Sequence, residues 1–187
     1  MFGSRQRHLS ALLLATTAVL GLSPGAALSA LSASAANLTF GPLAYSHATQ
    51  ASAGIMTLTA TDTGSLGLGL TNAGWNVTVL SSPFAYSGPY NGTPIPAQNL
   101  AITAARVPSR ISGQAISSTG GPRTTGVTGT LDAARKTLQA DGPSGIIPTH
   151  NGIGTYTQLI DVQLTIPGRA STGTYTATLT VTISTGP

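Results

Sequence analysis

The four residues Asp62-Thr63-Gly64-Ser65 form the pattern in this chain that comes closest to a catalytic motif. The same pattern carries the reactive carboxylate of aspartic proteases, in which two such groups share a proton and activate water. Those enzymes set the aspartate after apolar strand residues, whereas Ala60 and Thr61 precede it here. Asp and Gly together are also typical of a turn, because Asp bonds its own backbone and Gly tolerates positive φ. We interpret Asp62 as a turn residue without a catalytic role.

No other set of residues has the spacing that catalysis or metal binding requires. His47 and His150 are far apart in the sequence, and neither has a carboxylate pair nearby. The chain has no Cys, which excludes a thiolate metal site, a Cys nucleophile and a disulfide framework. Only 4 residues are Asp or Glu, so pairs for general acid–base catalysis are scarce. We predict that the protein is not an enzyme and binds no cofactor and no metal.

A loop at residues 83–92 carries three aromatic residues, Phe84, Tyr86 and Tyr90, among Pro, Ser, Gly and Asn. Aromatic rings at loop tips can stack on sugar rings, which makes these residues candidates for contact with a glycan. The alternative is that the same rings close one end of a folded domain. The sequence leaves both interpretations open.

The composition limits the classes of partner. Charged residues make up 6% of the chain and hydrophobic residues 41%. Average domains are about 25% charged, so hydroxyl and amide groups must form most of the polar surface, and the hydrophobic share excludes a wholly disordered chain. No Lys/Arg run is available to neutralise phosphates, which argues against nucleic acid. We interpret the basic residues in the middle of the chain as solubilising groups, with binding of an anionic polymer as the alternative. They are Arg106, Arg110, Arg123, Arg135 and Lys136.

The amino end has the three parts of a secretory signal peptide. Arg5, Arg7 and His8 precede an apolar stretch at residues 9–22, and Ala33-Ser34-Ala35 fits the small-residue rule for cleavage. The apolar stretch is shorter than the roughly 20 residues that span a membrane, which favours a cleaved leader over an anchor. Cleavage would divide the chain into a signal peptide, 1–35, and a mature domain, 36–187, of 187 − 35 = 152 residues. We expect that domain to be secreted, with no membrane-spanning segment.

The pattern of the mature domain predicts a series of strands. Between residues 174 and 184, five apolar residues alternate with Thr or Ser, and residues 160–166 repeat the pattern. Such alternation places one row on a core and one in water. The seven-residue connection at 167–173 predicts that the two form an antiparallel hairpin. Further strands are expected at 38–45, 56–61 and 75–79, and weaker ones at 100–104, 115–117, 128–131 and 137–140, with one or two helical turns as the alternative at 132–139.

Many short strands, frequent turns and no break in composition predict an all-β fold, a single antiparallel β-sandwich. A β-barrel is the alternative.

Two of these strands resemble the motifs of WxL domains. Gly74-Trp75-Asn76-Val77 is similar to the first motif, Trp-x-Leu, with Val77 in place of Leu. The end of the chain is similar to the second, Tyr-x-x-x-Leu-Thr-Trp-x-Leu followed by a near-terminal Pro, with Val for Trp and Ile for the last Leu. Its residues are Tyr175, Leu179, Thr180, Val181, Ile183 and Pro187.

The resemblance implies a cell-surface protein of a Gram-positive bacterium, held without a covalent bond on the cell wall through peptidoglycan. It also implies membrane-anchored WxL-interacting proteins as partners. Because the motif residues fall on apolar rows at i, i+2 and i+4, we interpret the motif mainly as part of the core. The glycan would then contact the Thr rows, including Thr180, or the aromatic loop, since hydroxyl groups both donate and accept hydrogen bonds.

A different function class stays open. The strands are rich in Thr, nearly uncharged and without the Lys and Pro that usually protect sheet edges. Such strands also suit a structural subunit of a surface layer or pilus-like assembly, which would build by strand exchange or edge pairing.

Overall fold

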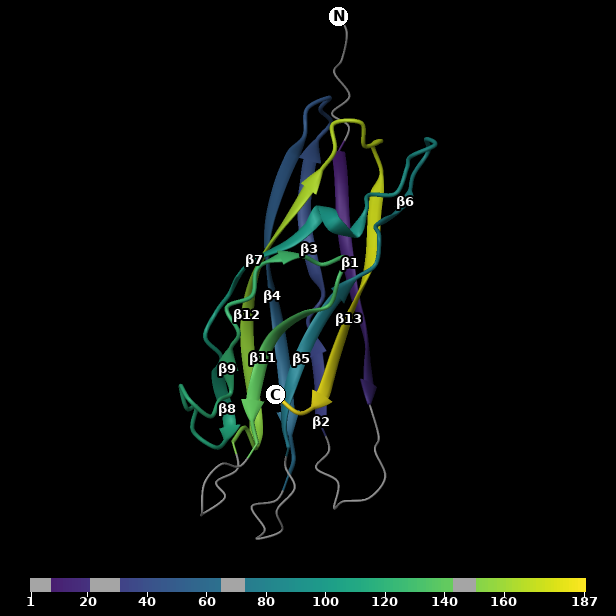
Figure 1. Cartoon of the computed structure of the whole chain (residues 1–187). Helices are drawn as coiled ribbons and strands as arrows, with labels where there is room; N and C mark the ends of the chain where they lie inside the picture. The colour runs from purple at the N-terminus through teal and green to yellow at the C-terminus, as the bar shows by residue number, and fades with distance from the viewer. Residues whose placement is uncertain (1–7, 21–30, 65–72, 143–150) are drawn as a thin grey trace, which may run out of the picture.

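The computed structural model describes residues 8–20, 31–64, 73–142 and 151–187, and for residues 8–20 it describes the course of the backbone. These residues form two sheets (Figure 1). The first sheet has the order β3 (Leu38–Ala44), β1 (His8–Leu20), β13 (Thr174–Thr185), β5 (Gly74–Ser81), β11 (Arg135–Asp141) and β9 (Arg123–Thr124), with β6 (Ala85–Ser87) beside β13. The second has the order β10 (Gly129–Thr130), β7 (Leu100–Ala105), β12 (Gly154–Ile166), β4 (Gln50–Asp62) and β2 (Leu31–Ala35), with β8 (Ser109–Gly113) beside β12. A short 3-10 turn, η1 (Ala97–Asn99), leads into β7.

The core lies between the two sheets and is built from the alternating rows. In β5, β12 and β13, every second side chain is buried and its neighbours are partly exposed. The period of two along a strand sends successive side chains to opposite faces, so each strand gives one row to the core. The largest buried side chains come from both sheets and the loops between them: Trp75, Tyr156, Tyr175, Phe40, Phe84, Met56 and Leu58. The predicted β-sandwich is confirmed.

The predicted hairpin of the last two strands is wrong. β12 pairs with β4, β7 and β8 in the second sheet, whereas β13 pairs with β1, β5 and β6 in the first. The connection at residues 167–173 is long enough to cross the roughly 10 Å between packed sheets. Both sides of β12 are already taken by other strands, so β13 pairs elsewhere.

Two weaker expectations also differ from the structure. Residues 132–139 form no helical turn, because Arg135–Asp141 is strand β11 with Thr137, Leu138 and Ala140 facing inward. Residues 115–117 are not a strand, and only Ser117 forms an isolated bridge, with Gly121.

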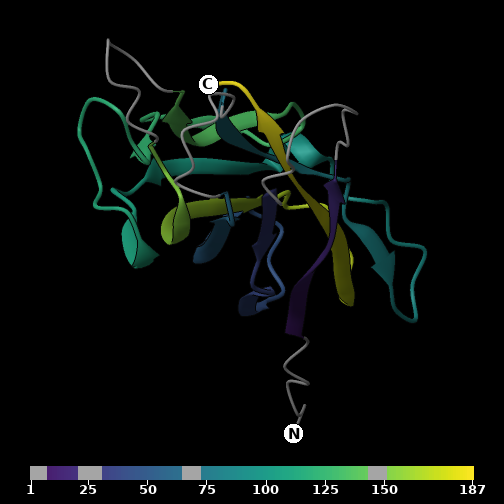
Figure 2. The same ribbon diagram turned by 90° about the horizontal axis from the view of Figure 1, so that it is seen from below.

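The expected leader takes part in both sheets. Residues 9–20 of its apolar stretch belong to strand β1, which lies between β3 and β13, and the expected cleavage sequence lies in β2 at the edge of the second sheet. Both views place β1 beside β13 (Figure 2). The β1–β13 pair is parallel, whereas all other strand pairs of the described residues are antiparallel. Removal of residues 1–35 on export stays a prediction.

Candidate functional site

The two segments that resemble the WxL motifs are neighbouring strands. β5 and β13 pair in antiparallel register, with Val77 opposite Ile183, Val79 opposite Val181, and Trp75 opposite Thr185. Residues that face each other across a sheet share one face, so both motifs contribute to the same buried row. Val77 and Val181 are 0% and 3% exposed. The motif therefore joins the end of the chain to the middle of the first sheet.

Trp75 is a core residue. Its side chain is completely buried, and its indole Nε1–H donates a hydrogen bond to the Gly152 carbonyl oxygen at 3.2 Å. The indole centroid lies 6.4 Å from the ring of Tyr156, tilted by 41°. A Cβ at Gly152, whose φ is +80°, would lie 2.8 Å from the indole nitrogen. The expected burial of Trp75 is confirmed.

The second motif is buried in the same way. Tyr175, Leu179 and Ile183 are each no more than 4% exposed. The Tyr175 hydroxyl donates to the Ser171 carbonyl oxygen at 3.0 Å, and burial raises the pKa of that phenol, which keeps it neutral. Thr180 lies on the outward row and is half-buried, and Pro187 is exposed.

The last residues are tied to the first motif by two hydrogen bonds. The Gly186 N–H donates to the Gly74 carbonyl oxygen at 2.9 Å, and the Asn76 side-chain amide donates to the Gly186 carbonyl oxygen at 2.7 Å. Among the motif residues, then, Thr180 and Pro187 reach the surface while the others build the fold.

The aromatic loop divides into a buried part and an exposed part. Phe84 is completely buried, so it belongs to the core and is not available to a glycan in this fold. Tyr86 is half-buried: its hydroxyl donates to the Thr172 carbonyl oxygen at 3.0 Å and accepts from the Tyr90 N–H at 3.1 Å. The ring of Tyr86 lies 5.3 Å from that of Tyr175. Tyr90 is 47% exposed and is the most solvent-exposed aromatic residue of the loop.

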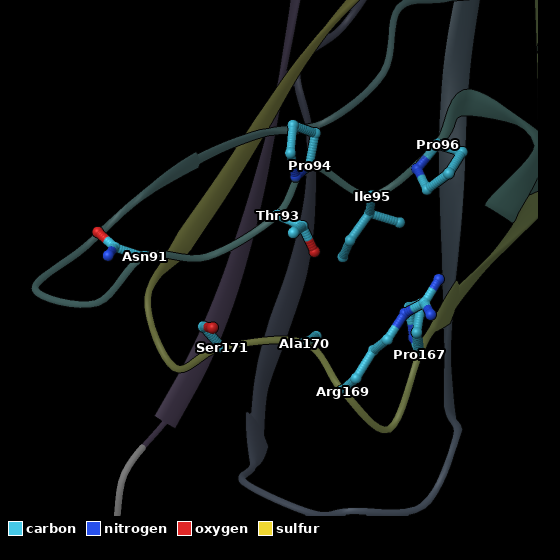
Figure 3. A pocket seen from close by; sticks show the side chains of 9 residues that line it. All are labelled: Asn91, Thr93, Pro94, Ile95, Pro96, Pro167, Arg169, Ala170 and Ser171. Carbon is cyan, nitrogen blue, oxygen red and sulfur yellow. The ribbon is translucent and has the colours of Figure 1, made fainter.

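A pocket of about 450 Å³ lies next to this loop (Figure 3). Two segments line it: the irregular stretch that comes after Tyr90, and the connection between β12 and β13. We call it the loop pocket, and its residues are Asn91, Thr93, Pro94, Ile95, Pro96, Pro167, Arg169, Ala170 and Ser171. Ile95 and Ala170 are buried, whereas Asn91, Thr93 and Arg169 are exposed at the rim. The Phe84–Ile95 backbone bridge and the Ala170–Pro167 hydrogen bond brace the two segments.

The chemistry of the loop pocket is mixed and mostly uncharged. An amide, two hydroxyl groups and one guanidinium surround an apolar floor of proline, isoleucine and alanine. Binding sites for small polar molecules have this character, with an apolar surface and a few convergent hydrogen-bonding groups. A sugar ring presents hydroxyl groups at its rim and C–H groups on its face, and it would find partners for both here.

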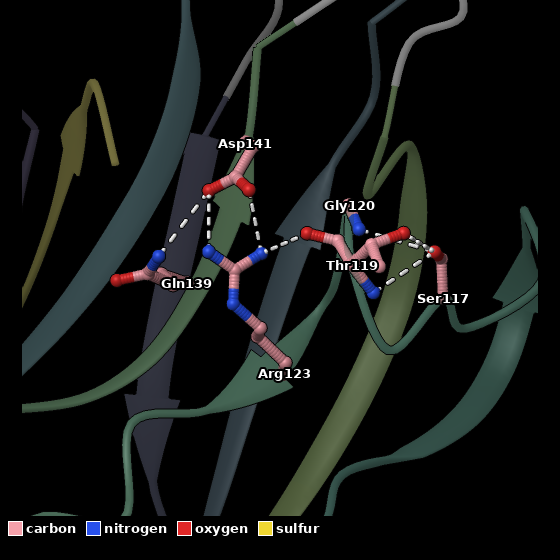
Figure 4. Close-up of polar contacts among 6 residues, drawn as sticks. All are labelled: Ser117, Thr119, Gly120, Arg123, Gln139 and Asp141. Atoms are coloured by element: carbon pink, nitrogen blue, oxygen red, sulfur yellow. Dashed lines mark hydrogen bonds and ion pairs between the residues drawn. The ribbon is translucent and has the colours of Figure 1, made fainter.

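Ion pairs neutralise part of the basic surface. The Arg106 guanidinium donates two hydrogen bonds to Asp161, at 2.6 and 2.9 Å, and this lowers the pKa of the Asp161 carboxyl group. Arg123 binds Asp141 in the same forked way, at 2.6 and 2.9 Å, and Gln139 donates to the same carboxylate (Figure 4). These two arginines are held between strands, which is a structural use of their charge.

The remaining basic residues of the middle segment are dispersed. Arg110 donates to the Gly113 carbonyl oxygen at 3.1 Å, and Arg135 donates to the Thr130 carbonyl oxygen at 2.9 Å. Arg110 lies on β8 in the second sheet, whereas Arg135 and Lys136 lie on β11 in the first. This arrangement agrees better with solubility than with one anion-binding face.

Asp62 behaves as the turn interpretation predicts. It is the last residue of β4, it is 1% exposed, and its Oδ1 accepts the Gly64 N–H at 2.8 Å. His47 is exposed on a loop with its ring 5.1 Å from that of Tyr45, and His150 lies outside the described residues. In the described part of the chain, no three His, Cys, Asp or Glu side chains are close enough together to hold a metal ion.

The loop pocket itself could not be predicted from the sequence, although the aromatic loop beside it was. In the sequence, Arg169 is one charge among few, and nothing marks the Thr93-Pro94-Ile95-Pro96 stretch as part of a site. The prolines in both segments indicate irregular backbone on the surface, and they are the one local signal. The meeting of the two segments depends on the crossing of the 167–173 connection between sheets, which no local signal reveals.

The comparisons with known proteins found no matching protein family and no matching curated protein. Within the described ranges, no helix has the length and apolar character that crossing a membrane requires.

Proposed function

We propose that this is an exported surface protein whose β-sandwich attaches it, without a covalent bond, to a polymer of the bacterial cell wall, with peptidoglycan as the first candidate. The observation that carries the proposal is the loop pocket: a recess rimmed by an amide, two hydroxyl groups and one guanidinium on a surface with very few charges. The resemblance of the β5 and β13 segments to WxL motifs supports the same function and adds membrane-anchored WxL-interacting proteins as candidate partners.

The pocket contributes the recognition and the motif contributes the scaffold. Asn91 and Thr93 stand on one side of the recess and Arg169 on the other (Figure 3). Tyr90 precedes Asn91 in the chain and is exposed, which makes it a candidate for additional contact with a sugar bound at the rim. Because the motif side chains are buried, their contribution to attachment is to hold the 167–173 connection in place through β13.

Pelleting with purified cell walls tests the proposal. We expect the protein to sediment with walls, and the replacement Arg169→Gln combined with Asn91→Ala to weaken sedimentation about tenfold or more. The matched control is Arg110→Gln, which removes an exposed arginine on β8, a strand that does not line the pocket. Equal binding by the pocket variant and the wild type would remove the pocket from the function.

Salt distinguishes recognition of sugars from attraction to anionic polymers. The mature domain would carry six basic and four acidic residues, 6 − 4 = +2, so long-range attraction should be small. We expect wall binding to change little between low salt and about 0.15 M, where screening acts over about 8 Å. Binding that disappears over this range would instead assign the interaction to the basic residues of the middle segment, Arg106, Arg110, Arg123, Arg135 and Lys136.

A further inference from the structure

Strand β1 fills a position between two other strands of the first sheet. It pairs in parallel with β13, from Ser10 opposite Thr174 to Leu20 opposite Ile183. On its other side it pairs antiparallel with β3, along residues 8–13. In the described part of the chain, β1 is the strand that connects β3 to the rest of its sheet. Figure 1 shows β1, in purple, running between β3 and β13.

The same segment is the apolar part of the leader that export would remove, so an inference drawn from its removal rests on the proposed export. Cleavage after Ala35 would take away β1 and also β2, which pairs with the end of β4. The first sheet would then have β13 and β3 separated by the width of one missing strand. With neighbouring strands about 4.8 Å apart, this gap is about 10 Å wide. We call it the strand slot.

We propose that the strand slot of the mature chain binds an extended, uncharged segment of a partner protein, rich in Leu, Ala, Val and Thr, that runs parallel to β13. A strand in this position would form main-chain hydrogen bonds with both walls, which give β-strand addition its affinity. This is the direction of β1, which runs parallel to β13 and antiparallel to β3.

The walls of the strand slot favour a neutral and apolar occupant. Neither β13 (TYTATLTVTIST) nor β3 (LTFGPLA) contains a charged residue. The inward row of β13 is core, with Ala177 at 5% exposure and Val181 at 3%. An empty slot would leave main-chain N–H and C=O groups of a twelve-residue strand unpaired, without the lysines or prolines that usually protect an edge. A charged occupant would lie against apolar surface without a counter-charge.

The slot is not expected to close by movement of β3. Leu38 and Phe40 anchor that strand in the core, at 4% and 2% exposure. They pack against Gly54 of β4 so closely that a Cβ there would lie 2.8 Å from Leu38 Cδ1 and 3.1 Å from Phe40 Cε1. A shift by one strand position would break this contact.

A second copy is also a poor occupant. A strand inside the slot must pair with β13 on one side and with β3 on the other. The β13 strand of a second copy already pairs with β5 and β6 along one side, so it cannot pair with both walls. The β3 strand of a second copy has seven residues and includes Pro42, which lacks the N–H that a central strand needs.

The experiment begins with the full chain, which carries β1 in place. A protease site is inserted within residues 21–30, which join β1 to β2, and the folded protein is cut there. We expect the amino-terminal fragment to remain bound during gel filtration and to exchange, one for one, with a fluorescent peptide of residues 8–20 that carries a solubilising tag. Peptides with Leu13→Pro or Leu13→Lys should bind at least about tenfold more weakly, because one loses a main-chain donor and the other places an unpaired charge opposite the buried Ala177.

The direction of the bound strand is tested by disulfide formation, since the chain has no cysteine of its own. Ser10 and Thr174 are register partners near one end of β1, so the pair Ser10→Cys and Thr174→Cys should form a disulfide on oxidation. The control pair, Ser10→Cys and Thr182→Cys, should form one only if the strand binds in the reverse direction, because eight residues along a strand span roughly 26 Å.

Three results would overturn the proposal. One is a cut protein that loses the fragment and stays a folded monomer without affinity for the peptide. Another is a cut protein that assembles with itself and excludes the peptide, which would make a second copy the occupant. The third is a disulfide in the control pair in place of the expected one. None of these measurements involves cell walls, so failure here leaves wall attachment untouched, and failure of wall pelleting leaves the strand slot untouched.

Discussion

Replacing Trp75 with alanine should harm folding before it harms recognition. The side chain is completely buried between the sheets, and removing a buried aromatic side chain typically costs about 3–5 kcal/mol. The change also removes the indole donor from the Gly152 carbonyl oxygen, and a buried acceptor without a partner costs about 1–3 kcal/mol. A domain of this size is stable by about 5–15 kcal/mol in total. Trp75→Ala should therefore be marginally stable.

Thermal and urea unfolding followed by circular dichroism measure this effect. For a chain of this length, 1 kcal/mol corresponds to about 2–4 °C, so the lost ring alone should lower the midpoint by about 6–20 °C, and the lost hydrogen bond should lower it further. Trp75→Phe keeps an aromatic ring in the core and loses the hydrogen bond, and it should fall between the wild type and alanine. Tyr90→Ala is the exposed control and should change stability by no more than about 0.5 kcal/mol.

Fluorescence gives an independent check, because Trp75 is the single Trp of the chain. A blue-shifted emission that acrylamide barely quenches agrees with the core position. A red-shifted, freely quenched emission would contradict it. So would a fully stable Trp75→Ala protein that no longer sediments with walls, which would move this residue from the scaffold to the binding site.

Substitutions at three other residues have equally specific expected outcomes. Gly152→Ala should lower the free energy of unfolding in urea by about 1–3 kcal/mol, because a Cβ there would lie 2.8 Å from the indole nitrogen. Gly126→Ala is the control: its φ is +66°, but no atom lies within 4 Å of the added Cβ, so it should lower the free energy of unfolding by less. The rate at which a denatured protein is hydrolysed at acid pH should be the same with the Asp62→Asn variant as with the wild type. Hydrolysis by the wild type that the variant lacks would refute the turn assignment. The Arg106 guanidinium holds the pKa of Asp161 below its usual value, so the pair stabilises the fold above that value and ceases to do so as the pH falls through the lowered pKa. The melting temperatures of the wild type and Asp161→Asn should thus differ near neutral pH and converge as the pH falls, and a difference that does not shrink in acid would contradict this.

The strands could be predicted from the sequence because their signal is local. In β13, five apolar residues alternate with Thr and Ser, and the period of two alone tells which side chains are buried. The same pattern predicted the burial of Trp75 in β5. The turn role of Asp62 was also local, since it depends on a hydrogen bond to a residue two positions ahead.

The candidate site was predicted only in part. The aromatic loop was recognised by its residue types, but composition could not separate buried Phe84 from exposed Tyr90. That difference arises from the Phe84–Ile95 bridge, which turns one ring into the core. Arg169 joins the loop pocket from about eighty positions further along the chain, through a contact between two loops.

The sequence by itself determined the all-β class, the division of each strand into a buried and an exposed row, and the scarcity of charge on the surface. These properties depend on residue type and on the geometry of a single strand. The tertiary structure alone decided which strands are partners. β13 pairs with β5 and lies in a different sheet from β12, and β1 lies between β13 and β3. Partner choice is non-local, because a connection of seven residues can either turn within one sheet or cross to the other. The partner of a strand depends on which strand edges are still unpaired and which apolar rows are still exposed to water. Both are properties of the assembled sandwich.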